Sequence, residues 1–417
     1  MHARGCKDNN DQAIYIEEMK RAVMIRYGEL FLKSEPVMRH YVGVLTANIK
    51  KALDAAEICH EITVTRGRIF VYGEDADAIA SVLSGIFGIV SISIVICTPP
   101  DRETIEKTAA LVASRTLKPG MSFAVRARRS NIKGFTSQEL AASTGSCIYD
   151  AVGDLIVDLK NPEYEIFVEA RSDGGYIYET KIPGPGGLPV GTQGKVLCLL
   201  SAGIDSPVAA WLAMRRGCVP GFIYFEGGDY FGKDTNRAVL ENLENISRWY
   251  PGHTIEAAFI DITPFFDRLT DRSDRSTKDA LKNRCIICKR FMLRLAGECA
   301  FAWKYLGLVT GNSIGQVASQ TLANVGIIGA VVPEGLSLIE PLITYDKEET
   351  VVIARNIGTF RDNAGDLSCG IVPSHPSIAA SLEKVLEDEG KLGITELIEE
   401  CIPRKTIYRA KDGKLLD

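Results

Sequence analysis

The sequence lacks the apolar segments that direct a chain to a membrane or across one. Its first residues, MHARGCKDNNDQ, are polar and contain no apolar core of a secretory signal. The longest apolar runs, near Ile89–Cys97 and Val325–Val332, are too short to span a bilayer. We therefore expect a chain that works away from membranes.

Histidine is scarce, and neither sign of charge dominates. Among the five histidines, His253 and His375 have no catalytic partner nearby in the sequence, so no nucleophilic triad is predicted. The formal net charge is -5, which gives the chain no overall basic signature of nucleic-acid binding. Any RNA site must therefore be a local patch.

A disulfide framework is also missing, because the 11 cysteines have no regular spacing. This usage favours a reducing cytoplasm. Internal repeats and low-complexity segments are absent as well. The 417 residues, 46% of them hydrophobic and 24% charged, are typical of a globular protein of roughly three domains.

No Walker-type loop, G-x-x-x-x-G-K-[ST], is present. The stretch VLCLLSAGIDSPVAAWLAMRR, residues 196–216, instead predicts a buried strand, a short loop at 201–206 and a helix with Pro207 in its first turn. A helix start offers free N–H groups and partial positive charge, and small loop residues let the backbone close around an oxyanion. We predict a phosphate site here, with an ordinary strand–turn–helix connection as the alternative.

The rest of the chain divides into segments with different patterns. Residues 22–98 have the β-α-β-β-α-β order of a ferredoxin-like arrangement. From Lys195 onward strands and helices alternate as in a doubly wound parallel sheet, with one helix predicted over 314–322. The fold class is thus predicted as α/β, with α+β domains preceding the parallel sheet. The segments are a polar N-terminal extension (1–21), a ferredoxin-like domain (22–98), a second α+β domain (99–182), a Gly/Pro linker (183–194) and the parallel-sheet domain (195–417).

The second α+β domain carries a local basic patch. No Asp or Glu occurs between Lys107 and Gln138. Arg126 and Arg128 lie on one face of a predicted strand at 122–128, and apolar residues alternate on the other face. A one-sided basic strand suits a phosphate backbone, while a merely solvated charged face is the alternative. The predicted RNA-binding residues are Arg126, Arg128, Arg129 and Lys133.

Two of these segments resemble known families. The 201–206 loop resembles the SGG-x-DS loop of the PP-loop ATP pyrophosphatases, which split ATP between its α- and β-phosphates. Ala202 stands where that family usually has glycine. The segment FAVRARRSNIKGF, the helix after it and VDLKNP resemble a THUMP domain, and THUMP domains bind tRNA through its acceptor stem.

Longer segments resemble the tRNA 4-thiouridine synthetases, or tRNA uracil 4-sulfurtransferases. They are GELFLKS and IFGI in the ferredoxin-like domain, GPGGLPVG in the linker, and GNSIGQVASQTLANV and DKEETVVIARNIGTF in the last domain. The resemblance covers about residues 24–376 in the family's domain order. After Pro376 we expect helices near 378–389 and 394–400 but no rhodanese domain, as in archaeal-like members of the family.

The resemblance implies an enzyme that uses ATP and Mg²⁺ to adenylate the C4 carbonyl oxygen of a tRNA uridine, expected to be uridine 8. Sulfur then replaces that oxygen, giving 4-thiouridine, AMP and pyrophosphate. The negative charge that develops on pyrophosphate needs fixed N–H groups and a metal, and Asp205 is expected to help place the metal. The residues implied in ATP binding are Leu199, Leu200, Ser201, Gly203, Ile204, Asp205, Ser206, Tyr224, Phe225, Lys289, Arg290, Gly311 and Gln320.

Three cysteines complete the predicted catalytic set with Asp205. Cys285 and Cys288 form a C-x-x-C at the start of a predicted helix, where the dipole favours thiolate, and Cys369 lies far along the chain. In relatives that lack rhodanese, the resemblance implies that three such cysteines hold a [4Fe–4S] cluster with one iron open to sulfide. The alternatives are a persulfide relay resolved by a disulfide, a zinc site that lacks a fourth ligand, and three buried small side chains.

The partners implied by the resemblance are tRNA, ATP, and sulfide or a persulfide donor. It leaves a homodimer and a role in thiamine synthesis open. A catalytically weak tRNA-binding protein is one alternative function, with Ala202 as the first sign of decay. A PP-loop ligase that delivers nitrogen is another, and the cysteine set argues against it because amination needs no thiolate.

Overall fold

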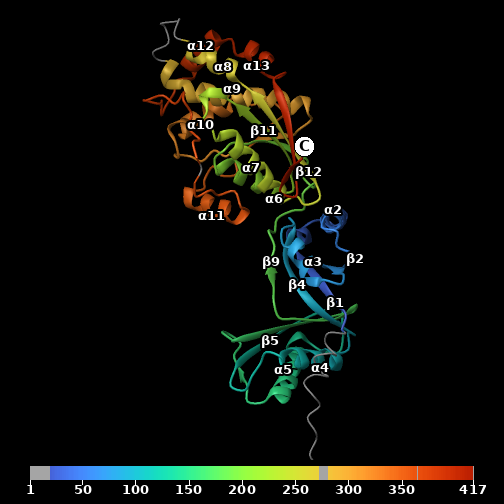
Figure 1. The fold of residues 1–417 in the computed structure, drawn as a ribbon. Helices are drawn as coiled ribbons and strands as arrows, with labels where there is room; N and C mark the ends of the chain where they lie inside the picture. Colours follow the sequence, from blue (N-terminus) through green and yellow to red (C-terminus); the bar gives the residue numbers. More distant parts are fainter. Residues whose placement is uncertain (1–18, 272–279, 364, 417) are drawn as a thin grey trace, which may run out of the picture. The chain divides into compact units, whose positions relative to one another are not determined.

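The computed structural model describes residues 19–271, 280–363 and 365–416, so most of the predicted extension at 1–21 lies outside the described residues. The chain forms two compact units (Figure 1). The first unit contains the described residues up to Phe31 together with Ala56–Ser84 and Ile89–Gly186. The second contains Leu32–Ala55, Gly85–Gly88 and the described residues from Gly187 onward.

The first unit is built on a nine-stranded sheet with the order β2-β3-β1-β4-β8-β7-β5-β6, and β9 pairs with β4. Its strands are β1 (Arg21–Tyr27), β2 (Glu61–Thr65), β3 (Arg68–Tyr72), β4 (Ile89–Thr98), β5 (Ser122–Ser130), β6 (Ile156–Val157), β7 (Tyr164–Arg171), β8 (Gly174–Tyr178) and β9 (Ile182–Pro183). Its helices are the 3₁₀ turn η1 (Glu29–Leu32), α3 (Ala76–Leu83), α4 (Arg102–Ala113) and α5 (Ser137–Val152).

Local sequence signals explain where these helices begin. Asp75 caps α3, Asp101 caps α4, and Thr136 forms a capping box with Glu139 at the start of α5. The strand order β2-β3-β1-β4 and its antiparallel pairing are those of a ferredoxin-like sheet. The predicted ferredoxin-like fold is thereby confirmed.

The second unit contains a seven-stranded sheet with the order β14-β13-β10-β11-β12-β15-β16. Its strands are β10 (Lys195–Leu199), β11 (Val219–Glu226), β12 (Thr254–Asp261), β13 (Gly307–Val309), β14 (Ser337–Ile339), β15 (Lys405–Lys411) and β16 (Lys414–Leu416). Its helices are α2 (Glu35–Ala55), α6 (Asp205–Arg215), η2 (Gly228–Tyr230), α7 (Thr235–Ser247), α8 (Thr263–Thr270), α9 (Ala280–Ala302), η4 (Ala318–Gln320), α10 (Leu322–Gly329), α11 (Lys347–Ile357), α12 (Leu382–Leu392) and α13 (Ile394–Cys401).

Both faces of this sheet are buried, as a doubly wound sheet requires. Val196 and Cys198 of β10 belong to one apolar cluster, and Leu197 between them belongs to another. The first cluster includes residues of α6 and α7, and the second includes residues of α8 and α9. The parallel sheet predicted from the strand–helix alternation is confirmed for β10–β14.

Two local features of the second unit differ from the sequence-based expectation. The helix predicted over 314–322 is wrong: a short η4 is followed by α10, because the Thr321 hydroxyl accepts a hydrogen bond from the Asn324 N–H and starts a new helix. The sheet also ends in an antiparallel hairpin, β15–β16, which pairs with β12. Within the described residues, none of the helices combines the length and the apolar character needed to cross a bilayer.

Candidate functional site

The 201–206 loop lies at the point where the strand order of the second unit reverses. β10 is flanked by β11 on one side and β13 on the other, and ligands of open α/β sheets bind beyond the strand ends at this position. The segment after β13 approaches the start of α6 closely, since a Cβ on Gly311 would lie 2.8 Å from both Asp205 C and Ser206 N. Glycine at 311 is therefore needed for the local packing, besides its predicted place in the ATP site.

The loop itself is built from small residues joined by hydroxyl groups. The Ser201 N–H donates to Ser206 Oγ at 2.8 Å, and the two hydroxyl oxygens are 2.9 Å apart. Ala202 does not have a positive φ, and it is buried in the apolar cluster beside α6. Alanine can thus adopt the backbone conformation of this position, where glycine is usual. Ala202 is therefore no evidence that the loop has lost its function.

Gly203 has a different role from Gly311. Its φ is not positive, and an added Cβ would lie 3.6 Å from Ser201 Oγ, which is an ordinary contact. Neither backbone conformation nor packing in the unliganded protein requires glycine there. The missing side chain leaves space beside the loop, as close approach of a ligand to the backbone requires.

The Asp205 carboxylate at the start of α6 faces two side chains that sequence reasoning missed. Lys347 Nζ lies 2.8 and 3.0 Å from its two oxygens, and Gln316 Nε2 donates to it at 3.3 Å. Lys347 is the first residue of α11, which Asp346 caps through a capping box with Glu349. The DKEE sequence could have indicated this contact. Its Asp caps the helix and so fixes where α11 starts, which in turn sets the direction of the Lys side chain.

Asp205 also fits the predicted role in holding magnesium. Mg²⁺ in nucleotide sites is commonly held by one or two carboxylates together with phosphate oxygens. Asp205 supplies one such carboxylate at the start of α6, and Lys347 is the cation that pairs with it in the unliganded protein. In the described ranges no group of three His, Cys, Asp or Glu side chains is arranged to hold a metal ion, so the remaining ligands would come from the nucleotide and water.

A polar network joins three segments beside the loop. Asn312 Oδ1 accepts from Gln320 Nε2 at 3.2 Å and from Lys289 Nζ at 3.5 Å, and Asn312 Nδ2 donates to Glu340 Oε1 at 2.7 Å. Burial lowers the pKa of Lys289, and the neighbouring Cys285 and Cys288 act in the opposite direction. Gln320 Oε1 is buried and has no partner within the described chain, which leaves an acceptor for a ligand donor.

Arg290 does not belong to this network, and its predicted contact with ATP is corrected. Its side chain is 2% exposed and forms a two-pronged ion pair with Glu389, at 2.7 and 3.0 Å. Its remaining nitrogen donates to the Ile327 carbonyl oxygen. The guanidinium therefore fastens α9 to α12, and its burial keeps it from reaching a phosphate.

Tyr224 and Phe225 stand near the carboxyl end of β11, but their side chains are in the core. They are 3% and 4% exposed and belong to the clusters on opposite faces of the sheet. The Tyr224 hydroxyl donates to Asn236 Oδ1 at 2.8 Å. Any contact of these two residues with a nucleotide would therefore be made by their backbone groups.

Cys285 and Cys288 lie one turn apart on α9, with Cys288 in the apolar cluster of α8 and α9. Cys369 packs against the same cluster, and its charge acts on both other thiols. The predicted dipole-stabilised thiolates are not found, because burial first and Cys369 second raise the pKa of Cys285, and burial likewise raises that of Cys288. Cys369 therefore lies close enough to act on the other two thiols, and burial favours the neutral form of Cys285 and Cys288, but the three side chains are not arranged as a ready metal site.

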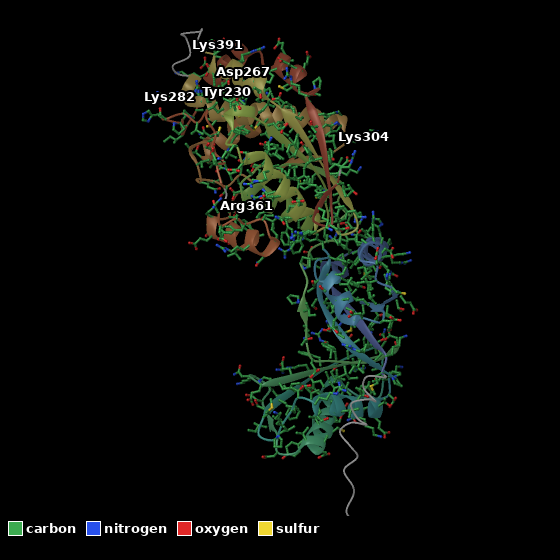
Figure 2. All side chains as sticks on the ribbon, viewed as in Figure 1. Tyr230, Asp267, Lys282, Lys304, Arg361 and Lys391 are labelled. Carbon is green, nitrogen blue, oxygen red and sulfur yellow. The ribbon has the colours of Figure 1, made fainter. Side chains whose placement is uncertain are left out.

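The segment of Cys369 is held by the loop that follows β11. Cys369 forms an antiparallel bridge with Phe231, and the Gly370 N–H donates to the Tyr230 carbonyl oxygen at 2.8 Å. The Tyr230 hydroxyl in turn donates to Asp267 Oδ1 at 2.8 Å (Figure 2). Backbone contacts far apart in the sequence, which motif reading does not detect, therefore place Cys369 near the C-x-x-C.

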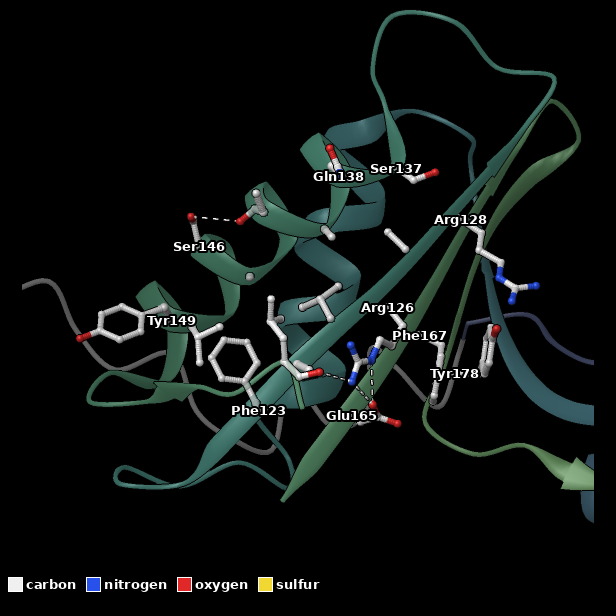
Figure 3. Close-up of a pocket in the computed structure, with 18 of the residues that line it drawn as sticks. Phe123, Arg126, Arg128, Ser137, Gln138, Ser146, Tyr149, Glu165, Phe167 and Tyr178 are labelled. Carbon is white, nitrogen blue, oxygen red and sulfur yellow. Dashed lines mark hydrogen bonds and ion pairs between the residues drawn. The ribbon is translucent and has the colours of Figure 1, made fainter. Parts of the chain in front are cut away.

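A second candidate site is a cavity of about 1030 Å³ in the first unit, which we call the basic groove (Figure 3). β6 pairs with only Ser122 and Phe123 of β5, so the rest of β5 is an open edge of the sheet, and the groove follows it. Arg126, Arg128 and Lys181 line the groove, together with aromatic residues. Lys181 Nζ lies 3.8 Å above the Phe167 ring, which stacks on Tyr178.

The predicted RNA-binding residues are not equivalent in this groove. Arg126 is paired with Glu165 at 2.7 Å and also donates to the Leu159 carbonyl oxygen, whereas Arg128 is exposed and has no ion pair within the described chain. Arg129 and Lys133 are exposed but do not line the groove. Lys181, which does line it, was missed because it lies in the linker-like stretch outside the basic strand.

Comparison with known proteins gives the same domain order. The family described as "Thiamine biosynthesis protein (ThiI)" matches residues 191–394, the "ThiI ferredoxin-like domain" matches 22–93 and the "THUMP domain" matches 101–179. A 4-thiouridine synthetase crystallised with RNA and bound ATP is similar to this chain at a TM-score of 0.80 and 26% identity, over 95% of this chain and 100% of that one. A Pyrococcus horikoshii Ot3 protein matches at a TM-score of 0.62, over 81% and 99%.

Curated relatives extend over nearly the whole sequence. A probable tRNA sulfurtransferase of Methanosarcina acetivorans is 35% identical over 409 residues, 97% of each chain. One of Methanothermobacter thermautotrophicus is 38% identical over 390 residues, 91% of this chain and 95% of that one. One of Moorella thermoacetica is 34% identical over 395 residues, 92% and 96%. The chain therefore belongs to the tRNA sulfurtransferase family.

Proposed function

We propose that this enzyme uses ATP to activate the C4 carbonyl oxygen of a tRNA uridine, at position 8, and then exchanges that oxygen for sulfur. The observation that carries the proposal is the 201–206 loop at the reversal of strand order, with unfilled space beside Gly203 and the Asp205–Lys347 pair at the helix start. These features suit a pyrophosphate group bound by backbone N–H groups. The ATP-bound 4-thiouridine synthetase supports the choice of nucleotide.

The first step would transfer AMP to the uridine. The C4 oxygen attacks the α-phosphorus, the bond between that phosphorus and the bridging oxygen breaks, and pyrophosphate leaves. Negative charge grows on the leaving group, so the donors at the start of α6 stabilise this step more than the ground state. Lys347 adds a positive charge at the same place, held there by Asp205.

The polar network beside the loop would hold the remainder of ATP. The buried, unpartnered Gln320 Oε1 suits a donor such as the adenine amino group, and Lys289 is the cation nearest to it in the network. Magnesium, held by Asp205 and phosphate oxygens, would neutralise part of the charge on the triphosphate. These assignments concern Leu199, Leu200, Ser201, Gly203, Ile204, Asp205, Ser206, Tyr224, Phe225, Lys289, Gly311 and Gln320, and they leave Arg290 out.

The second step needs a sulfur nucleophile, and we assign its delivery to Cys285, Cys288 and Cys369. The proximity of Cys369 to both other thiols suits a persulfide on one cysteine that another resolves. The same three side chains are not preset as a metal site, so they would have to shift to become ligands of a [4Fe–4S] cluster. In either case sulfur bonds to C4, and AMP leaves with the original uridine oxygen. On the persulfide route a persulfide donor supplies the outer sulfur, the second cysteine then breaks the S–S bond to C4-bound sulfur and forms a disulfide, and a thiol reductant restores the two cysteines. A cluster, when bound, supplies an open iron that carries sulfide, and the raised pKa of the free thiols implies that binding it releases protons.

The basic groove would bind the tRNA. Arg128 and Lys181 provide positive charge beside an open strand edge, and the Phe167–Tyr178 pair gives the groove an aromatic wall. Charge together with flat apolar surface is suited to RNA whose bases are partly unstacked. The RNA-bound relative supports tRNA as the partner.

The test uses unmodified tRNA with the anaerobically prepared enzyme, ATP, magnesium and sulfide, followed by nucleoside mass spectrometry. We expect 4-thiouridine, with AMP and pyrophosphate in equal amounts, and no thiolation of a transcript in which uridine 8 is replaced by cytidine. Release of ADP and phosphate would contradict the PP-loop chemistry. Conversion of uridine to cytidine when ammonium replaces sulfide in the assay would favour a nitrogen-delivering ligase. Binding of tRNA with no nucleotide turnover would favour the binding-protein alternative.

A further inference from the structure

The carbonyl oxygens of the 201–206 loop are covered by two side chains that lie far away in the sequence. Asn242 Nδ2 donates to the carbonyl oxygens of Ser201, at 2.9 Å, and Gly203, at 3.4 Å. Arg361 Nη1 donates to the carbonyl oxygen between them, that of Ala202, at 3.2 Å. Three successive peptide groups therefore point their oxygens toward the same pair of side chains.

Arg361 and Asn242 are themselves fixed to α7 and to each other. Arg361 Nη2 donates to Asn242 Oδ1 at 2.9 Å and to the Ala238 carbonyl oxygen, and its Nε donates to Glu241 Oε2 at 2.8 Å. Asn242 is completely buried, and the side chain of Arg361 is 15% exposed. All three nitrogens of the guanidinium are engaged, so Arg361 has little capacity left to bind a ligand directly.

The other side of these peptide groups is unpaired. In a trans peptide the carbonyl oxygen and the following N–H point in opposite directions, so the N–H groups of Ala202, Gly203 and Ile204 face away from Arg361 and Asn242. None of these three N–H groups makes a hydrogen bond within the described chain, and Ile204 has no side-chain cap. They form a row of donors next to the space beside Gly203.

We infer that Arg361 and Asn242 are positioning residues that hold the loop's carbonyl oxygens back and so keep its N–H groups directed at pyrophosphate. The inference rests on the proposed function, because it concerns the same phosphate site. We call Arg361 and Asn242 together the clamp. Without the clamp, each peptide group can rotate and turn its carbonyl oxygen toward the anion, and the partial negative charge of that oxygen repels the anion. Loops of this type preorganise charge stabilisation only when their dipoles cannot relax.

The test measures pyrophosphate and AMP binding by calorimetry on the full chain for Arg361→Gln and Arg361→Lys. We expect Arg361→Gln to weaken pyrophosphate binding about ten- to a hundred-fold, the loss of one or two charge-assisted hydrogen bonds. AMP affinity and tRNA affinity should change by less than about threefold, because the clamp touches neither adenosine groups nor the basic groove. Arg361→Lys, which keeps the charge but cannot bond in three directions, should give an intermediate pyrophosphate affinity.

Arg237→Gln is the matched control. Arg237 lies on the same helix, approaches the same Glu241 at 3.9 Å and is 69% exposed, but it does not contact the loop. It should bind pyrophosphate as the unmodified protein does. Unchanged pyrophosphate binding in Arg361→Gln would overturn the inference alone, and so would an equal loss of pyrophosphate and AMP binding with a broadened urea transition. An unmodified protein that binds neither pyrophosphate nor ATP would overturn the proposed function itself.

Discussion

The two regions of this protein that we propose to bind phosphate are built in opposite ways. In the second unit the donors are backbone N–H groups of the 201–206 loop, and buried side chains behind the loop fix their direction. In the first unit the donors are side chains along an open strand edge, and one of them, Arg128, is exposed and has no ion pair within the described chain. The first arrangement suits a reaction that needs exact orientation, and the second suits an RNA backbone that needs charge over a wide area.

Arginine illustrates the difference. Arg290 is buried and Arg361 is largely buried, and both use their donors on protein oxygens, so they maintain geometry. Arg128 keeps its donors in solvent, and Arg126 lies between these extremes because it shares its charge with Glu165. The effect of replacing an arginine, on stability or on ligand binding, should therefore depend more on its hydrogen-bond partners than on its distance from a ligand.

The largest effect is expected for Asp205→Asn. The substitution keeps the size of the side chain but removes the charge that holds Lys347 and would hold magnesium. AMP formation should fall by roughly a hundred- to a thousand-fold, as when a preorganised charge contact is lost. Filter binding should show unchanged tRNA affinity, since the basic groove is in the other unit. Normal AMP formation in this variant would show that the Asp205–Lys347 pair has no role in catalysis.

Cys369→Ser should stop sulfur transfer while leaving ATP binding intact. The serine hydroxyl can neither ligate iron as a thiolate does nor carry a persulfide. Mass spectrometry should detect no 4-thiouridine, and exchange of labelled pyrophosphate into ATP should persist. Cys147→Ser is the matched control, because Cys147 is similarly half-buried but belongs to the first unit.

Iron analysis of the same samples decides between the two sulfur carriers. Brown anaerobic protein containing iron and acid-labile sulfide in near-equal amounts, bleached by Cys369→Ser, would support the cluster. Colourless protein that thiolates tRNA with a persulfide donor and a thiol reductant, but not with sulfide alone, would leave the persulfide relay, because sulfide cannot form a persulfide without an oxidant. Thiolation by the Cys369→Ser variant at the normal rate would contradict both.

Arg290→Met should act on stability rather than on ATP. Glu389 would remain almost fully buried with only Arg294, at 2.8 Å, as partner, and an under-compensated buried carboxylate typically costs about 3 kcal/mol. Urea unfolding should show this loss, and the double variant Arg290→Met, Glu389→Met should recover most of it. A variant of normal stability with weakened ATP binding would restore the original assignment of Arg290.

Residues 288–290 show what sequence reasoning could and could not supply. The strands, the loop and the order of domains follow from local alternation and contiguous motifs, because period and spacing are properties of short segments. Lys289 and Arg290 are adjacent on one helix but have different roles. Lys289 contacts Asn312 and Arg290 contacts Glu389, and both partners belong to distant segments. The same reason explains why the sequence did not predict the roles of Lys347, Arg361 and Asn242. It also explains the unpredicted hairpin β15–β16, which pairs with β12, a strand far away in the sequence.

Arg128→Gln should weaken tRNA binding in a salt-dependent way. An exposed arginine that contacts one phosphate contributes about one unit to the slope of log affinity against log salt. Titrations between low and physiological salt should show that the slope falls by about this amount, while AMP formation at saturating tRNA is unchanged. Lys133→Gln, outside the groove, is the control, and an equal effect of the two substitutions would favour a diffuse charged face over a groove.

The smallest effect is expected for Glu165→Gln, and its sign is the informative part. Arg126 Nε donates to Glu165 at 2.7 Å, and both side chains are 37% exposed, so this ion pair is worth at most about 1 kcal/mol. A tRNA phosphate must compete with Glu165 for the guanidinium, and neutralising the carboxylate removes that competition. Binding should therefore tighten by roughly two- to fivefold at low salt, with a steeper salt slope.

The double variant Arg126→Gln, Glu165→Gln sharpens this test. It removes both charges, so the net charge of the groove stays as it is in the unmodified protein, and tRNA affinity should return close to that level. If Glu165→Gln instead weakened binding, Glu165 would be holding Arg126 in the orientation that contacts RNA. The ion pair would then be a positioning contact like those behind the 201–206 loop. Only Arg128 and Lys181 would remain as groove donors without such a contact, so the two regions would differ less.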